Sequence, residues 1–292
     1  MEIVYLVTDA DHGLRAVDVL VMRTGMSRLM SKRIRLYGEL LNNGRPWRMI
    51  DPVERGDQLV ARTAGHSGQP SSLRQPAGID FIYQDDWLVI LNKPAGIVVH
   101  PTYRHETGTL TDLLSEQPLH PVSRLDRDTS GLVMIARNGH AHYVVMQQPM
   151  KKTYLALVHG RMPERQGLID APISRDPDSI IKRRVDPSGS VARTLYREVH
   201  YFPAAAVSTV EFELLTGRTH QIRVHSQFVG NPLVGETLYG HSGEDQTDLD
   251  RQLGRQALHA RSLGFIHPQT KEPVLVHAPL PSDLRQILHQ LS

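Results

Sequence analysis

The stretch that says most about this chain is Val122-Ser123-Arg124-Leu125-Asp126-Arg127-Asp128-Thr129-Ser130-Gly131-Leu132. In it, an aspartate flanked by two arginines leads through Thr-Ser-Gly into an apolar run over residues 131–136. A continuous apolar run of this length is typical of a strand that is buried on both faces. The polar part alone also fits an ion-paired turn, so other segments have to decide between a structural turn and a reactive aspartate.

A second segment covers residues 152–160, and its residues 152–158 alternate in the manner of a sheet strand. One face of this predicted strand carries Tyr154, Ala156 and Val158, and the other carries Thr153, Leu155 and Leu157. The structural interpretation is a plain strand with Tyr154 in the core. The functional interpretation makes the same tyrosine part of a site.

A third segment, residues 214–225, places a glycine turn before a helix that we predict over residues 221–228 and that Gly230 closes. Arg218, His220 and Arg223 crowd the start of this helix. Cations near a helix N-terminus oppose the helix dipole. They are therefore either surface charges or partners of an anionic group.

Two further strand patterns, over residues 193–200 and 207–214, follow the second segment. The expected strands are short, are separated by loops and lack a regular βαβ spacing. We therefore predict an α+β fold with a mixed, mainly antiparallel sheet and flanking helices and loops.

A boundary falls at residues 64–79, where Gly, Ser and Pro dominate and no periodic pattern persists. We predict a small α+β module over residues 1–63, a linker over 64–79 and a larger domain over 80–292. Residues 1–75 carry 11 basic and 8 acidic side chains, whereas the remainder carries 22 and 23. The net charge of +2 for the whole chain, small for a nucleic-acid binder, hides this basic first part.

The small module is predicted to contain two short helices and a small sheet. Ser27 is placed to cap the second helix, which stops near Gly38, and Asn43-Gly44 is typical of a type I′ hairpin turn. The candidate nucleic-acid phosphate contacts in this part are Arg28, Lys32, Arg33, Arg35, Arg45 and Arg48. A solvated helix face would explain a single basic stripe, but here a second basic cluster follows across a tight turn.

The composition excludes several kinds of chemistry. The chain has no cysteine, which rules out disulfides, thiol nucleophiles, iron–sulfur clusters and cysteine-bound zinc. Its 16 histidines are scattered and show no cluster with carboxylates, so we expect no metal. No apolar run approaches a membrane span and the first residues do not resemble a signal peptide. We expect a cytoplasmic protein without a membrane partner.

From about Phe81 to the C-terminus, these segments resemble the RluA-type RNA pseudouridine synthases. Further matching stretches are residues 91–101, 232–240, 258–260 and 267–268. The family signature His-Arg-Leu-Asp-x-x-Thr-Ser-Gly-Leu falls on residues 123–132, with Ser123 at the position of the usual histidine. The resemblance implies a pseudouridine synthase fold and an isomerase that needs no cofactor.

The resemblance also implies roles for single residues. Asp126 would be the catalytic aspartate and Arg223 the cation paired with it. Tyr154 would stack on the target base, and Arg124 would occupy the gap that the extracted base leaves in the RNA. The cations Arg218 and His220 are further expected RNA contacts.

The first module resembles the S-four-like RNA-binding module found at the ends of RNA-modifying enzymes. The matching stretches are residues 25–28, 32–34, 43–44 and 52–57, whereas residues 45–48 depart from the usual short loop. The expected partner is therefore RNA, either large-subunit rRNA or tRNA, and we expect a monomer.

The chemistry of the reaction suits these residues. Pseudouridine formation detaches uracil from its ribose, rotates the base and rejoins it through carbon. Unstacking a base costs a few kcal/mol, and an aromatic platform such as Tyr154 returns roughly 1–3 kcal/mol per stacked base. A carboxylate can act as a nucleophile or as a base, and a neighbouring arginine favours its charged form in a buried site.

Two alternatives remain open from the residues. One is a glycosidase-like hydrolase that uses Asp126 and Asp128 as a carboxylate pair. The other is a non-catalytic RNA-binding or ribosome-assembly factor with the same fold.

Overall fold

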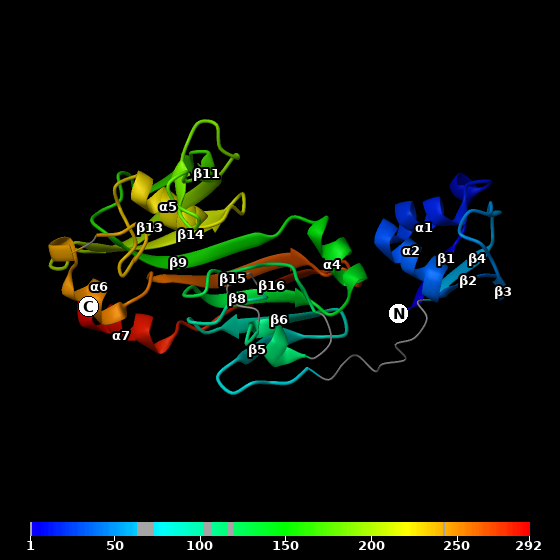
Figure 1. Cartoon of the computed structure of the whole chain (residues 1–292), viewed down its shortest axis with the longest axis horizontal. Coiled ribbons are helices and arrows are strands. Elements are labelled where there is room, and N and C mark those ends of the chain that lie inside the picture. The colour runs from blue at the N-terminus through cyan, green and yellow to red at the C-terminus, as the bar shows by residue number, and fades with distance from the viewer. Residues whose placement is uncertain (1, 63–72, 102–106, 116–118, 242) are drawn as a thin grey trace.

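The computed structural model describes residues 2–62, 73–101, 107–115, 119–241 and 243–292, without the side chains of residues 33, 36, 37 and 244. Two large sheets organise the described residues, a four-stranded sheet in the first part and a ten-stranded sheet in the rest, and a two-stranded hairpin adds to them (Figure 1). Each sheet has hydrophobic clusters of its own.

The first sheet has the strand order β1-β4-β2-β3 and is accompanied by two helices. Its elements are β1 (Glu2–Leu6), α1 (Ala16–Thr24), α2 (Arg28–Tyr37), β2 (Glu39–Asn42), β3 (Arg45–Pro46) and β4 (Gln58–Arg62), with a 3₁₀ turn at Asp9–Asp11. The predicted pair of helices and small sheet is confirmed.

Local signals set the boundaries of these elements. The hydroxyl of Ser27 accepts a hydrogen bond from the backbone N–H of Met30 at 3.1 Å, so Ser27 caps α2 as predicted. Asn43 and Gly44 have φ values of 50° and 78°, the pair of positive angles that a type I′ turn requires. The turn joins β2 to β3 and pairs Asn42 with Arg45.

The large sheet has the order β10-β13-β14-β9-β15-β8-β6-β5, with β16 paired to β15 and β7 paired to β8. Its strands are β5 (Asp80–Gln84), β6 (Leu88–Lys93), β7 (His120–Pro121), β8 (Ser130–Ala136), β9 (Lys151–His159), β10 (Gln166–Asp170), β13 (Arg193–Phe202), β14 (Val207–Leu214), β15 (Leu258–Ile266) and β16 (Pro273–His277). Among the described pairings, β8 with β15 is parallel and the others are antiparallel. The predicted α+β fold with a mixed, mainly antiparallel sheet is confirmed.

Short helices and one small hairpin complete this part. The helices are α3 (Leu110–Leu114), α4 (Gly139–Met146), α5 (Gln221–Phe228), α6 (Asp248–Leu253) and α7 (Ser282–Leu291), with a 3₁₀ turn at Gly243–Asp245. The hairpin pairs β11 (Ile173–Arg175) with β12 (Arg183–Val185) and lies beside α5. The predicted helix over residues 221–228 matches α5 in both of its bounds.

The apolar run after Asp126 forms β8, whose seven residues are all buried. The strand packs on two hydrophobic clusters at once, with Met134 in one and Val133 in the other. This explains why its sequence is continuously apolar, since a strand covered on both faces has no solvent side. The alternation predicted for residues 152–158 is also confirmed, because Tyr154 and Leu157 of β9 belong to different clusters.

Gly131 allows β8 and β15 to meet directly after the aspartate segment. Its φ of +110° lies in the region that only glycine adopts readily. A Cβ at this position would overlap the backbone of Ala260, including its nitrogen at 2.6 Å. The strand after Asp126 therefore needs glycine both for its backbone angle and for the close approach of β15.

Most of the expected linker, residues 64–72, lies outside the described residues. Its last part packs on the large domain, because Leu73 contacts the cluster around Ile135 and Ile79 is 2% exposed. Among the described helices, none has both the length and the apolar character that a membrane crossing requires.

Candidate active site

Asp126 lies in the loop that enters β8 and is bound by an arginine from α5. The guanidinium Nη1 of Arg223 donates to Asp126 Oδ2 at 3.0 Å. The Arg223 side chain is 5% exposed, whereas that of Asp126 is 27% exposed. The structure thus brings together two residues that are 97 positions apart and leaves the carboxylate reachable from solvent.

Arg223 is bound even more closely by a second carboxylate, Glu236. Its Nε and Nη2 donate to the two oxygens of Glu236 at 2.7 and 2.6 Å, and the Glu236 side chain is fully buried. Burial acts to lower the pKa of Arg223, but the hydrogen bonds and charges of Glu236 and Asp126 outweigh it and raise that pKa. The anionic group expected near the cationic start of this helix is therefore a pair of carboxylates.

Glu236 was missed by the sequence analysis. Its signal was weak, a single carboxylate after the apolar run Pro232-Leu233-Val234. Only a burial prediction for that run would have shown that the carboxylate needs a cationic partner.

Tyr154 lies on β9, is 7% exposed and packs in the cluster with Phe212 and Ile222. Burial and then the charge of Asp126 raise the pKa of Tyr154, so its phenol stays protonated. Leu125, the neighbour of Asp126, packs against the same cluster as Tyr154. The tyrosine is thus a protonated aromatic ring in the part of the fold that carries the Asp126 loop.

His220 precedes α5 in a left-handed backbone conformation with φ of 57°. Its Nε2 is 3.8 Å from Asp126 Oδ1, and its Nδ1 lies 2.7 Å from the hydroxyl of Tyr239. That hydroxyl accepts the backbone N–H of Arg183 at 2.8 Å, so its own proton is directed to His220 Nδ1. Burial lowers the pKa of His220 although the charge of Asp126 opposes this, and the neutral ring then presents its Nε2–H towards Asp126.

Lys93, at the end of β6, fixes the aspartate segment from the other side. Its ammonium is fully buried and donates to the backbone oxygens of Pro94, Ile97 and Arg127 at 2.8–2.9 Å. Burial lowers the pKa of Lys93 to about 7, and the charges of Asp128 and Asp126 oppose that effect. Three carbonyl acceptors suit an ammonium group, which has three protons to donate.

Several other residues of the aspartate segment have defined partners. Ser123, at the position of the family's histidine, is buried and accepts the backbone N–H of Met134 at 2.9 Å. Asp128 pairs with its neighbour Arg127 at 3.0 Å, whereas Asp126 is bound by Arg223. Arg124, two positions before Asp126 in the chain, is exposed.

The other predicted RNA contacts are distributed over two parts of the chain. Arg218 is exposed, and its Nε donates to the backbone oxygen of Val191 at 3.0 Å. In the small module, exposed cations are Arg28, Lys32, Arg35 and Arg45, and the side chain of Arg33 lies outside the described residues. Arg48 is exposed but pairs with Asp51 at 2.6 Å.

The sequence analysis was wrong to find no cluster of histidine and carboxylate. Among the described residues, His159, His241 and Asp250 place one ligand atom each within 4.8 Å of one another. The carboxylate of Asp250 is already engaged, because it accepts His159 Nε2 at 2.8 Å and the backbone N–H groups of Gly235 and Thr247 at 2.6 and 2.9 Å. This cluster therefore caps α6 and holds the loop that carries Glu236.

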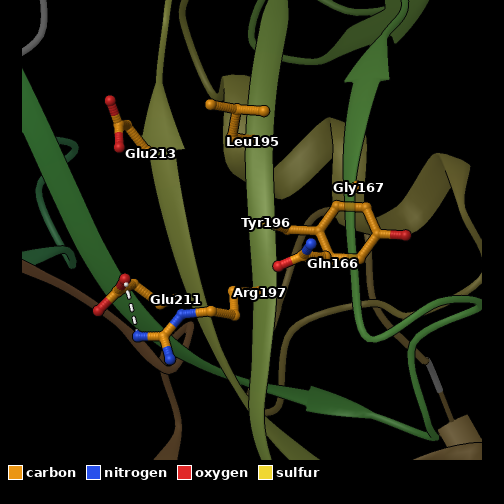
Figure 2. A pocket seen from close by; sticks show the side chains of 7 residues that line it. All are labelled: Gln166, Gly167, Leu195, Tyr196, Arg197, Glu211 and Glu213. Atoms are coloured by element: carbon orange, nitrogen blue, oxygen red, sulfur yellow. Dashed lines mark hydrogen bonds and ion pairs between the residues drawn. The ribbon is translucent and has the colours of Figure 1, made fainter.

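A cavity of about 460 Å³ lies elsewhere, on β10, β13 and β14 (Figure 2). It contains Tyr196, Glu213 and the ion pair of Arg197 with Glu211 at 3.2 Å. None of its lining residues belongs to the predicted site, so the site is defined by side-chain chemistry rather than by this cavity.

Solved structures of two human proteins share this fold. They are RNA pseudouridylate synthase domain containing 4 and RNA pseudouridylate synthase domain containing 1, with TM-scores of 0.57 for both. Their sequence identities are 26% and 25%, and the comparisons cover 72% and 75% of this chain and 92% and 97% of the human chains.

The sequence profile of the family described as RNA pseudouridylate synthase matches residues 87–228. A Bacillus subtilis relative, the uncharacterized RNA pseudouridine synthase YjbO, is 36% identical over 86% of this chain and 90% of its own length. The ribosomal large subunit pseudouridine synthase D of Nitrosomonas europaea is 37% identical over 81% of this chain and 72% of its own length. The chain belongs to the RluA-type RNA pseudouridine synthases, a family of isomerases.

Proposed function

We propose that this chain converts uridines of large-subunit rRNA to pseudouridine with Asp126 as the catalytic carboxylate. The observation that carries the proposal is the placement of Asp126, which Arg223 binds at 3.0 Å while more than a quarter of the side chain stays exposed. An ionised carboxylate in this position is able to attack the anomeric carbon or to take a proton from the neighbouring ribose carbon. The bond from N1 to C1′ then breaks, and the base turns so that C5 faces C1′. As C5 bonds to C1′, the bond from Asp126 to C1′ breaks, or Asp126 returns the proton that it took from C2′. C5 then loses its proton to solvent, and N1 takes one up.

The neighbouring side chains take roles that match their surroundings. Tyr154 is a neutral, buried aromatic in the part of the fold that carries the Asp126 loop, which supports a role as the surface on which the target base stacks. Arg124 is exposed two positions before Asp126, which supports our assignment of this residue to the gap that the base leaves. We assign RNA contact also to Arg218 and His220, which border the same end of α5.

The substrate proposal comes from relatives and from the first part of the chain. The relatives from Nitrosomonas europaea and Pseudomonas aeruginosa are named ribosomal large subunit pseudouridine synthase D. We propose that residues 1–63 are an S-four-like RNA-binding module, joined by a linker over 64–79 to a catalytic domain over 80–292. The exposed Arg28, Lys32 and Arg35 on α2 support this role. We further propose that the protein acts as a cytoplasmic monomer.

The test is pseudouridine mapping across rRNA and tRNA in cells with and without the protein. We expect loss of one or more pseudouridines from large-subunit rRNA, restored by the wild-type chain but not by Asp126→Asn. Asp128→Asn is the matched control, because this carboxylate pairs with Arg127 instead of Arg223, and it should restore modification. Loss confined to tRNA would contradict the rRNA assignment, and restoration by Asp126→Asn would contradict the catalytic one.

A second measurement separates the reaction from hydrolysis. Purified protein should release tritium from uridine labelled at C5 without producing free uracil. Free uracil would support the glycosidase-like alternative, which requires Asp128 to act together with Asp126.

A further inference from the structure

Glu236 is a buried charged side chain that the roles above do not use. Its carboxylate is fully buried and binds Arg223 through two hydrogen bonds of 2.7 and 2.6 Å. The backbone N–H of Leu238 donates to Glu236 Oε1 at 2.9 Å, which adds a third contact. A buried charge with this many partners has one defined position.

Two carboxylates share one guanidinium in this arrangement. Glu236 takes Nε and Nη2 of Arg223, which is one complete edge of the group. Only Nη1 is directed at Asp126, through a single hydrogen bond of 3.0 Å to Oδ2. A bidentate ion pair, in which two nitrogens of arginine bind the two oxygens of a carboxylate, fixes the plane of the guanidinium.

The loop around Glu236 is itself held in place. The backbone N–H of Gly235 donates to Asp250 at 2.6 Å, and Asp250 also pairs with His159. The ring of Tyr239 lies 5.3 Å from the Arg223 guanidinium and closes another side of it.

We propose that Glu236 is a positioning residue for catalysis, which holds Arg223 in an orientation in which a single nitrogen, Nη1, reaches Asp126. Arg223 then neutralises part of the site without covering both oxygens of the catalytic carboxylate. Oδ1 of Asp126 has no contact from Arg223 among the described hydrogen bonds, and His220 Nε2 stays 3.8 Å away from it. Oδ1 is therefore the oxygen that reaches the ribose, and this inference rests on the proposed role of Asp126.

The test compares two substitutions that separate shape from charge. Glu236→Gln keeps the shape and removes the charge. Arg223 is then free to turn and to bind both oxygens of Asp126 through two of its nitrogens. Glu236→Asp keeps the charge and shortens the side chain. With unmodified large-subunit rRNA labelled with tritium at C5 of uridine, we expect Glu236→Gln to lower kcat at least 30-fold and to leave KM within twofold. Glu236→Asp should retain at least ten times the kcat of Glu236→Gln.

Controls keep the outcomes distinct. Glu198→Gln removes another buried carboxylate, one that accepts the N–H of Met162 and lies near Arg161, and kcat should stay within twofold. Wild-type protein without tritium release would contradict the proposed function itself. Given an active wild type, the positioning role is overturned in three cases. The first is a folded Glu236→Gln with kcat within threefold of wild type, the second is Gln retaining more activity than Asp, and the third is a Gln variant that fails to fold.

Discussion

Replacing Gly131 with alanine tests how strictly β8 and β15 must approach each other directly after the Asp126 loop. The new Cβ would lie 2.6 Å from the nitrogen and 2.8 Å from the carbonyl carbon of Ala260. Both atoms belong to the backbone of the parallel partner strand. The strands must therefore move apart by about 1 Å, because ordinary contacts of a Cβ begin near 3.4 Å.

The expected cost has two parts. Overpacking of a buried site costs about 1–3 kcal/mol, and a non-glycine residue at this φ costs about 1–3 kcal/mol more. We expect Gly131→Ala to lower the free energy of unfolding by about 4 kcal/mol, a large share of the roughly 5–15 kcal/mol of a typical domain. For a domain of this size, the Tm should fall by roughly 10 °C.

Two control glycines separate the cost of overpacking from the cost of backbone strain in urea-unfolding experiments. Gly230 has a φ of +85° and no atom within 4 Å of its would-be Cβ, so Gly230→Ala measures backbone strain alone and should cost about 1 kcal/mol. Gly217 has open space and no positive φ, so Gly217→Ala should change stability by less than about 0.5 kcal/mol. Equal losses for Gly131→Ala and Gly230→Ala would refute the argument from close strand contact.

Three further predictions concern the buried lysine, a buried histidine and the small module. Lys93→Met leaves the carbonyls of Pro94, Ile97 and Arg127 without their donor, and it should lower the free energy of unfolding in urea by about 3 kcal/mol. The control Lys151→Met removes an exposed ion pair with Glu213 and should cost less than about 0.5 kcal/mol. Similar losses for the two variants would refute the role of Lys93. Burial lowers the pKa of His259 from 6.5 to about 4, so the unfolded chain takes up this proton first as the pH falls. The stability that comes from the neutral, buried His259 is present above pH 6.5 and is lost as the pH falls towards 4. Over this window, the free energy of unfolding of the wild type should fall by about 3 kcal/mol more than that of His259→Gln. Parallel plots of unfolding free energy against pH for the two proteins would refute the assignment. Replacing Arg28, Lys32 and Arg35 together with alanine should reduce the slope of log K for RNA against log salt by about 2, and an unchanged slope would place the RNA elsewhere.

Short-range patterns predicted much of the fold. The apolar run after Asp126 predicted β8, the alternation around Tyr154 predicted β9, and Ser27 and Asn43-Gly44 predicted a helix cap and a hairpin turn. These features depend on residues within a few positions of one another, where side-chain size, backbone angles and hydrogen-bonding groups act directly on the local chain. The sequence therefore determined the elements, the fold class and the aspartate that the site is built around.

Long-range contacts decided the rest. The sequence showed Arg223 and Glu236 as separate charges, and only the packing of α5 against the loop after residue 232 joined them in one buried pair. The same holds for His159 and Asp250, which are 91 positions apart and form a cluster that the sequence analysis had excluded. Local patterns do not record these pairings, because burial makes a charge find its partner wherever the tertiary fold brings one within hydrogen-bonding distance. The sequence by itself singled out Asp126 as the candidate carboxylate, and the tertiary structure decided that Arg223 binds one of its two oxygens.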